Sequence, residues 1–321
     1  MKRTTKKVLK IILPLLLGVF FIYYSIKSAT PEERLELWEN ITSAHPGWIA
    51  LSLLCGLLSH LSRAYRWKYL LQPMGYNPKF ANRFMAVMAG YLANFGIPRS
   101  GEVLRGLTVS GYEDIPFEKA FGTIISERIA DFIMLLLIIG FTLLLQADYL
   151  LTYFRENEIN PLVTLGIFLI LLIAGIFTLK FIKRSSLPLM IKIKKFAKGL
   201  LEGMRSILRM KQKWAFIFHT LFIWLMYVLM TYVLIFTIPE TAGLSFGIVM
   251  VIFVVGSFTI SATNGGIGVY PVAIGAALML FGISKQGGEA LGWITWGSQT
   301  LLVLLLGGFS FLFLPVFNRK K

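Results

Sequence analysis

The sequence predicts an all-α, polytopic integral membrane protein, with about six transmembrane helices and two re-entrant helical hairpins that enter from opposite faces. Apolar and aromatic residues make up 56% of the 321 residues. Several apolar runs reach about 20 residues, the length that crosses the hydrocarbon core of a bilayer. Two further apolar runs are interrupted by proline or glycine before they reach that length. Together these features predict one transmembrane domain over residues 1–321.

The first part of the chain contains two predicted crossings. Val8 to Ile26 is an apolar run of 19 residues after a basic start, longer than the roughly 7 to 15 residues of a signal-peptide core. We expect it to be retained. Pro31 to Gly47 is acidic and amphipathic, which predicts a short helix on the far surface. Trp48 to Leu71 is the second predicted crossing, and it ends in a group of basic and aromatic residues.

The first re-entrant hairpin is predicted from two short segments around a break. Phe80 to Ile97 is apolar but short, Pro98 to Gly101 interrupts it, and Glu102 to Gly111 cannot cross a membrane. Backbone that leaves the helix at membrane depth is tolerated only where protein or water covers its polar groups.

The middle of the chain carries two more crossings and a basic stretch. Lys119 to Gln146 and Pro161 to Ile182 are predicted crossings, joined by a loop over Ala147 to Asn160. Lys183 to Lys213 has apolar residues at helical spacing and lysines opposite them. This pattern predicts a surface helix, over 188–211, on the anionic cytoplasmic leaflet.

The last third repeats the interrupted pattern. Trp214 to Ile238 is a predicted crossing. Phe246 to Ser261 runs into a break over Ala262 to Pro271, and Val272 to Ile283 is only half a crossing. These segments predict the second hairpin. Glu289 to Phe317 is the last predicted crossing.

The distribution of lysine and arginine predicts that both termini are cytoplasmic. With that orientation, and with each hairpin returning to its own side, all but four of the 32 basic residues lie on or near the cytoplasmic side. Nine of the 16 acidic residues, Glu289 among them, fall outside. A bias of this kind sets the orientation of membrane proteins. A full crossing by either hairpin would place basic segments outside.

The candidate functional site lies between Gly90 and Asp131, where charged residues interrupt apolar sequence. Five unpaired charges at the centre of a bilayer would cost about 12 to 17 kcal/mol, so these groups are expected to pair or to line a wet cavity. The five are Glu102, Arg105, Glu127, Arg128 and Asp131.

Arginines elsewhere offer partners for these acids. Glu127 and Asp131 share a helix face and must find cations elsewhere, and Arg63, Arg66, Arg99 and Arg105 are available. Guanidinium groups also suit phosphate, since they donate in a planar fork. A lipid headgroup that carries both an amine and a phosphate needs both signs of charge.

Four motifs occur in one order along the chain: Arg66-Trp67-x-x-Leu70-Leu71, Asn94-x-x-x-Pro98-Arg99-x-Gly101-Glu102-x-x-Arg105, Glu127-Arg128-x-x-Asp131 and Gly265-Gly266-Ile267-Gly268. In this set the chain resembles the lysylphosphatidylglycerol synthase transmembrane region family, the flippase half of the multiple peptide resistance factor. The resemblance implies a single flippase-like domain in the bacterial plasma (inner) membrane.

The sequence departs from the family in its last motif. Family members often have Pro-Gly-Gly-x-Gly-x-Arg-Glu there, whereas this chain has Asn264 in place of the proline and Tyr270-Pro271 in place of the charged pair. The family's synthase is a soluble domain that uses aminoacyl-tRNA, and nothing in this chain resembles it. We therefore expect no enzymatic activity.

Each candidate also has a structural interpretation. Glu102 and Arg105 either close the hairpin as a pair or bind a headgroup. Gly265, Gly266 and Gly268 either form a tight turn for packing or present amide groups to an anion. The predicted headgroup-binding set is Arg63, Arg66, Asn94, Arg99, Glu102, Arg105, Glu127, Arg128, Asp131, Gly265, Gly266, Gly268 and Tyr270.

Other classes of site are not predicted. His60 and His219 are isolated in apolar segments, and no HExxH motif or cysteine pair accompanies them, so no metal site is expected. No ATP-binding loop and no cofactor motif occur. The net charge of +16 falls in loops beside the crossings rather than on one folded face, which argues against nucleic acid.

Three functions therefore stay open. The first is a lipid flippase that binds and moves an anionic or zwitterionic phospholipid headgroup. The second is a non-catalytic partner or regulator of a separately encoded lipid synthase, and either could form a homo-oligomer. The third is an integral-membrane enzyme that uses Glu127 and Asp131 on a lipid phosphate, against which no nucleophile and base are paired in sequence.

Overall fold

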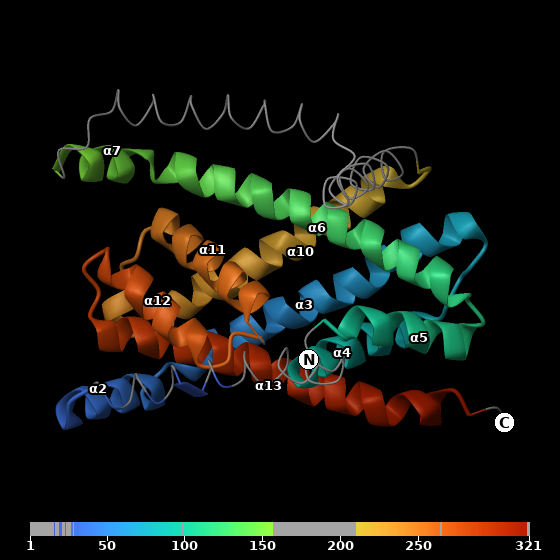
Figure 1. The fold of residues 1–321 in the computed structure, drawn as a ribbon, viewed down its shortest axis with the longest axis horizontal. Coiled ribbons are helices and arrows are strands. Elements are labelled where there is room, and N and C mark those ends of the chain that lie inside the picture. Colours follow the sequence, from blue (N-terminus) through green and yellow to red (C-terminus); the bar gives the residue numbers. More distant parts are fainter. Residues whose placement is uncertain are drawn as a thin grey trace, which may run out of the picture. The chain divides into compact units, whose positions relative to one another are not determined.

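The computed structural model describes residues 29–97, 99–156, 210–263 and 265–319, and a few positions between 16 and 27. The chain forms two compact units, one from residues 1–127 and 214–321 and one from residues 128–213. Every regular element in the described ranges is helical (Figure 1). The predicted all-α class is therefore confirmed over these ranges.

Within the described ranges, four helices are long and apolar enough to cross a membrane. They are α3 (Pro46–Leu71), α6 (Phe117–Leu145), α10 (Lys213–Leu234) and α13 (Lys285–Phe317). Each overlaps a predicted crossing, because a long apolar run is the strongest helix signal in a sequence of this kind. The other two predicted crossings, Val8 to Ile26 and Pro161 to Ile182, and the predicted surface helix over 188–211 lie wholly or almost wholly outside the described residues.

Two pairs of shorter helices occupy the predicted hairpins. The first pair is α4 (Phe80–Gly96) and α5 (Gly101–Glu113), and the second is α11 (Phe246–Ala262) and α12 (Val269–Met279). The members of each pair pack against each other. The second break is shorter than predicted, because Pro271 lies in the first turn of α12, where a proline displaces no helical hydrogen bond.

The two hairpins flank α13 from opposite ends (Figure 1). At one end, the Glu113 carboxylate of α5 accepts from the Lys79 amide just before α4. Asn82 of α4 and Asn318, which follows α13, exchange side-chain hydrogen bonds of 2.8 and 2.9 Å. At the other end, α12 packs on the first turns of α13. The first hairpin thus opens toward the end of α13, and the second toward its start.

The hairpin tips meet beside the middle of α13. Phe95, in the last turn of α4, lies so close to Gly265 that a Cβ on that glycine would be 3.1 Å from its ring. The Trp296 indole of α13 donates a 2.8 Å hydrogen bond to the Gly265 carbonyl oxygen. Gly265 has a φ of +68°, a conformation that glycine adopts without strain.

Glycines let α13 approach both hairpins closely. A Cβ on Gly292 would lie 2.6 Å from Pro271 Cα, and a Cβ on Gly307 would lie 2.7 Å from Leu92 Cβ. Around the second hairpin, α10, α11, α12 and α13 enclose an apolar core that includes Leu234, Ile252 and Leu278. Helix association in a bilayer depends on such close packing, since lipid offers no hydrophobic driving force.

The polar connecting segments also fold as helices. α2 (Pro31–Thr42) begins with a capping box in which Thr30 and Glu33 satisfy each other's backbone amides, and it packs on α13. This helix was predicted. α7 (Ala147–Glu156), in the second unit, replaces the loop predicted from Ala147. Its apolar residues recur at helical spacing with polar residues opposite them, a pattern of a short amphipathic helix that the loop prediction overlooked.

Candidate functional site

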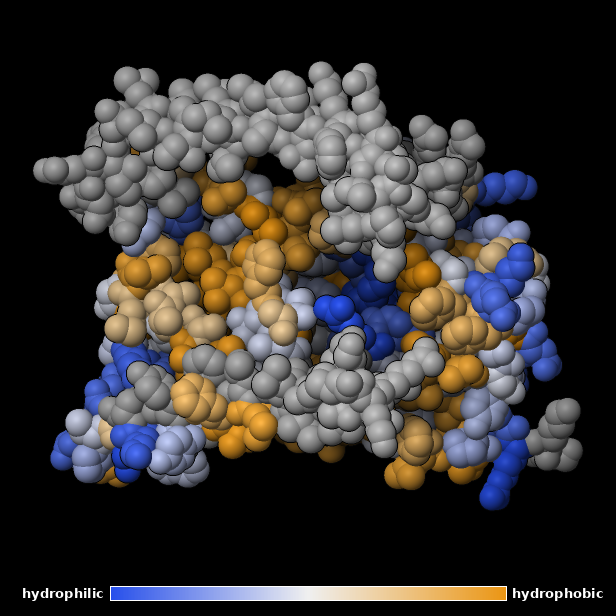
Figure 2. All heavy atoms as spheres, in the orientation of Figure 1, coloured by the Kyte–Doolittle hydropathy of each residue, from blue (hydrophilic) through white to orange (hydrophobic). Residues whose placement is uncertain are grey.

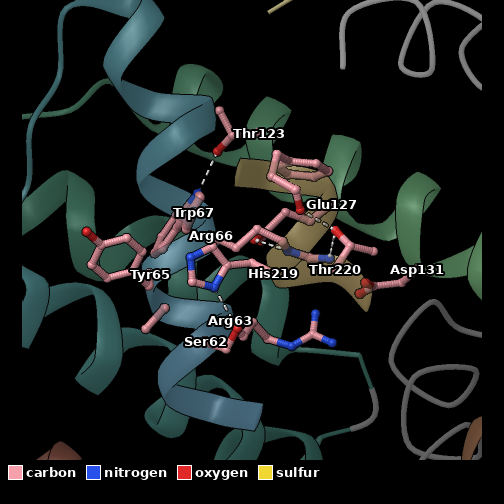
Figure 3. Close-up of polar contacts among 12 residues, drawn as sticks. Ser62, Arg63, Tyr65, Arg66, Trp67, Thr123, Glu127, Asp131, His219 and Thr220 are labelled. Atoms are coloured by element: carbon pink, nitrogen blue, oxygen red, sulfur yellow. Dashed lines mark hydrogen bonds and ion pairs between the residues drawn. The ribbon is translucent and has the colours of Figure 1, made fainter. Parts of the chain in front are cut away.

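A group of buried charged residues lies where α3, α5, α6 and α10 come together within the larger unit (Figure 3). Its centre is Glu127 of α6, whose side chain has no exposed surface. Arg105 Nη1 lies 2.6 Å from Glu127 Oε2, and Arg66 Nε lies 3.5 Å from Glu127 Oε1. Each arginine therefore faces a different oxygen of one carboxylate. The prediction that Glu127 finds its cations on other segments is confirmed.

Arg105 is held in place by an aromatic ring as well as by the carboxylate. Its guanidinium carbon lies 3.8 Å from the centroid of the Trp67 ring. The Trp67 indole donates a 2.8 Å hydrogen bond to Thr123 Oγ1, and Thr123 lies one helical turn before Glu127. A cation over a desolvated tryptophan face is worth about 2 kcal/mol or more. Trp67 thus fixes the plane of the guanidinium and ties it to α6.

Arg66 is oriented from α10. Its Nη1 donates a 3.0 Å hydrogen bond to Thr220 Oγ1, and its guanidinium carbon lies 5.2 Å from the centroid of the Phe216 ring. Figure 3 shows the Arg66 side chain extending between Glu127 and Thr220. Both arginines therefore have anchors that are independent of the carboxylate.

Arg63 lies one turn earlier on α3 and is also buried. Its Nη2 donates a 3.3 Å hydrogen bond to the Tyr227 hydroxyl of α10. Ser62, beside it, makes a 2.8 Å hydrogen bond with His219 Nδ1. The polar residues of α3 and α10 therefore bond to each other along the boundary between the two helices.

The buried charges at this place are predominantly positive. Arg63, Arg66 and Arg105 are 2%, 0% and 3% exposed, whereas the buried acids on the adjoining part of α6 are Glu127 and, one turn further, Asp131. An excess of positive charge in a medium of low dielectric attracts anions strongly. The face seen in Figure 2 shows hydrophilic residues near its middle, among mostly apolar ones.

Two predicted site residues pair with each other in the smaller unit. Arg128 Nη1 lies 3.5 Å from Asp131 Oδ2, three residues further along α6. Asp131 was expected to find its cations on other segments, and this contact adds a partner on its own helix. One helical turn suffices to bring the two side chains together.

Three predicted residues lie around the break of the first hairpin. Asn94 accepts a 2.8 Å hydrogen bond from the Gly101 amide at the start of α5, so it joins the two helices. Arg99 is exposed and has a φ of +61°, a conformation that few non-glycine residues adopt. Glu102 lies in the first turn of α5 and is half-buried.

The predicted residues of the second hairpin serve its turn. The amides of Gly265 and Gly266 donate to the Thr263 carbonyl oxygen and hydroxyl, at 3.1 and 3.0 Å. Both donors are thus used within the loop. Gly268 precedes α12 with a φ of +68°, and Tyr270 is buried against Gly256 of α11.

Sequence reasoning missed the residues that position the arginines. Trp67 was noted only as part of a motif, and Thr123 and Thr220 were not selected. A hydroxyl one turn before Glu127 is a signal that the sequence offered. Glu289, which was predicted to lie on the outer side of the membrane and was not selected as a site residue, is 4% exposed and packs on Gly275.

Metal binding finds no support in the described ranges. No group of three or more histidine, cysteine, aspartate or glutamate side chains within them is arranged to hold an ion.

The fold and site define a class: a multi-pass α-helical membrane protein with arginines and a carboxylate buried among its helices. The chain belongs to the lysylphosphatidylglycerol synthase TM region family, which matches residues 11–308. It is thus a membrane protein related to lipid metabolism.

One relative is the UPF0104 membrane protein MJ1595 of Methanocaldococcus jannaschii, which is 30% identical over 159 residues. The aligned segment spans 49% of this chain and 46% of that relative. No solved structure matches the chain.

Proposed function

We propose that this protein is a lipid flippase of the plasma membrane, which binds the phosphate of an anionic or zwitterionic headgroup at the cluster of Arg63, Arg66, Arg105 and Glu127. The observation that carries the proposal is the burial of three arginines, two of them paired with the buried Glu127, where α5 meets three helices of transmembrane length, α3, α6 and α10. Burying a phosphate in hydrocarbon without partners is prohibitive, so a protein that moves one needs polar groups already in place. Fixed guanidinium groups supply them.

The proposed topology is six crossings and two re-entrant hairpins, with both termini cytoplasmic. Helix ends of the larger unit gather into two groups, which supports it. One group joins His45 to Thr237 and Glu240 to Ser284 by hydrogen bonds, and the acidic α2 leads into it. The other joins Lys79 to Glu113 and Asn82 to Asn318. The basic residues next to the second group favour its placement in the cytoplasm.

We propose that translocation involves no covalent chemistry by this chain. The acidic residue at the centre of the cluster is paired with two arginines, an arrangement suited to holding charge rather than to removing a proton from a substrate. Product formation from lipid substrates by the purified protein would contradict this part of the proposal.

The test is a translocation assay with purified protein in vesicles that contain fluorescent phosphatidylglycerol or phosphatidylethanolamine. Movement between leaflets is followed by chemical quenching of the outer leaflet. We expect transport above protein-free vesicles, and its loss in Arg105→Ala. Lys119→Ala is the matched control, because Lys119 is an exposed cation on α6.

Both variants are first checked for a monodisperse elution profile and for an unfolding transition, so that a loss of transport is not a loss of folding. Transport by folded wild-type protein that equals the protein-free control for both lipids would refute the proposed function. So would full transport by Arg105→Ala.

A second candidate function is a membrane partner or regulator of a separately encoded lipid synthase. The family description favours it, since it names the transmembrane region of a synthase. Affinity purification from native membranes tests this candidate. Co-purification of a lipid-modifying enzyme, together with no transport by the isolated chain, would support it over the flippase.

A further inference from the structure

We propose that Glu127 is an internal substitute for the lipid phosphate: its carboxylate occupies the place between Arg66 and Arg105 that a phosphate diester takes on binding. This inference rests on the proposed function and deepens it, because it assigns the phosphate to two named arginines and gives Glu127 the role of competitor. The expected ligand is a phosphate diester with a single negative charge.

The chemistry of the two anions supports an exchange. A carboxylate and a phosphate diester each share one negative charge between two equivalent oxygens. In the structure, Oε1 of Glu127 faces Arg66 at 3.5 Å, and Oε2 faces Arg105 at 2.6 Å. The two unesterified oxygens of a diester suit the same pair of donors, because guanidinium groups bind carboxylate and phosphate in the same manner.

The anchors of the two arginines support it as well. Trp67 stacks on Arg105 at 3.8 Å, and Thr220 accepts from Arg66 at 3.0 Å. Neither contact involves Glu127. Withdrawal of the carboxylate therefore leaves both guanidinium groups oriented, which is what a site must offer to an incoming anion.

The charges of the three residues are compatible with an exchange. Arg66, Arg105 and Glu127 together carry one net positive charge, so one diester brings the three residues and their ligand to neutrality. The longer of the two contacts, that of Arg66 with Glu127, is the one that we expect to open first.

The experiment measures binding by the full-length protein in a phosphate-free maltoside detergent and a phosphate-free buffer. The probe is dihexanoyl phosphatidylglycerol below its critical micelle concentration, titrated by calorimetry and by the shift of the unfolding midpoint, which rises with ligand by mass action. We expect Glu127→Gln to bind this lipid about tenfold more tightly than the wild type, because the ion pairs of Glu127 with Arg66 and Arg105 no longer have to be broken.

The matched control is Glu118→Gln, since Glu118 is an exposed acid on the same helix, and its affinity should equal that of the wild type. Arg66→Gln and Arg105→Gln should each bind about tenfold more weakly. Glu127→Asp is the second variant in case Glu127→Gln does not fold. It keeps the charge but draws the carboxylate back by one methylene, so a smaller gain in affinity is expected.

Two results would overturn the exchange while leaving the proposed function in place. One is an unchanged or lower affinity of the folded Glu127 variants for phosphatidylglycerol, with binding still lost in the arginine variants. The other is a loss of dihexanoyl phosphatidylethanolamine binding in Glu127→Gln with phosphatidylglycerol unaffected, because Glu127 would then be the ligand of the amine. Equal binding by the wild type and both arginine variants would instead refute the proposed site itself.

Two further titrations identify the source of the phosphate. Glycerophosphoglycerol has the same headgroup without acyl chains, and inorganic phosphate has neither. Much weaker binding of both than of the short-chain lipid supports a lipid ligand. Equal binding of all three would overturn that assignment in favour of free phosphate.

Discussion

Glu127 is the residue that pairs with two of the buried arginines of the larger unit. Its two oxygens face Arg105 and Arg66, and its side chain has no exposed surface. Removal of one partner from a buried ion pair leaves the other partner uncompensated, which is far more costly than the pair itself is favourable. Replacing Glu127 alone should therefore lower the stability of the protein by more than the ion pairs themselves contribute. This is an asymmetry between losing one partner and losing the whole pair.

The first prediction follows from that asymmetry. Glu127→Ala should lower the free energy of unfolding by about 3 to 5 kcal/mol, because two buried guanidinium groups lose their counterion. Glu118→Ala, on the exposed first turn of α6, should lower it by less than about 1 kcal/mol. Thermal and denaturant unfolding in detergent measure both. Equal effects of the two variants would contradict the described pairing.

The second prediction concerns the hydroxyl that holds Trp67. Thr123→Val keeps the shape of the side chain but removes the acceptor of the indole N–H, and an unsatisfied buried donor costs about 1 to 3 kcal/mol. We also expect lower lipid transport, since Trp67 stacks on Arg105.

The control is Ser126→Ala, because the Ser126 hydroxyl bonds to the Gly122 carbonyl of its own helix. Its unfolding midpoint and transport should stay close to those of the wild type. A Thr123→Val protein as stable and active as this control would show that the indole hydrogen bond does not position Arg105.

At the scale of residues, charge in apolar sequence was an informative signal. It selected Arg66, Arg105 and Glu127, which the structure brings together, because a charge at membrane depth needs a partner. The roles of Trp67 and Thr220 were not accessible, since they depend on how α3, α5 and α10 pack. No local pattern encodes contacts between segments this far apart in sequence.

At the scale of elements, the hairpin of α4 and α5 depends on two facing glycines. A Cβ on Gly101 would collide with the Gly90 carbonyl oxygen and would lie 2.7 Å from Asn94 Nδ2. The two helices therefore approach each other as closely as their backbones allow. Such an approach is typical of helix pairs in membranes.

The third prediction tests this contact. Gly101→Ala should destabilise the protein by about 1 to 3 kcal/mol, because the helices must move apart to accept the methyl group. Gly111→Ala, on the same helix with no atom within 4 Å of its new Cβ, should instead stabilise it by about 0.4 to 1 kcal/mol. Unfolding midpoints of the two variants that move in the same direction would contradict the packing described here.

The elements were largely predictable, and their ends were not. Apolar runs predicted α3, α6, α10 and α13, because length alone distinguishes a crossing from other helices. Two boundaries were predicted wrongly: the second break was extended to Pro271, and a loop was assigned from Ala147. A proline disrupts the interior of a helix but is tolerated in its first turn. The position of Pro271 alone therefore does not show where the break ends and α12 begins.

At the scale of the whole molecule, the proposed topology makes the fourth prediction. In a Cys55→Ala background, which removes the one cysteine of the chain, single cysteines are placed at Glu36, Lys119 and Arg319, all exposed. A membrane-impermeant maleimide should label Glu36→Cys in intact cells. Lys119→Cys and Arg319→Cys should react only after permeabilisation.

The position at Lys119 is the decisive one, because it follows the first hairpin. A hairpin that crosses the membrane would place Lys119 outside, and its labelling in intact cells would disprove the re-entrant topology. The reactivity of Arg319→Cys under both conditions serves as the internal control for cell integrity.

The contact between Phe95 and Gly265 has a consequence for motion. Both hairpins are fastened near their open ends, one to the start of α13 and one to its finish, whereas their tips are held by a ring contact and one indole hydrogen bond. Separation of the tips would break the Phe95 contact and the indole hydrogen bond but would leave the hydrogen bonds near the open ends in place. A movement that begins there leaves both extremities of α13 in place, so the middle of this helix is where a reporter of conformational change belongs.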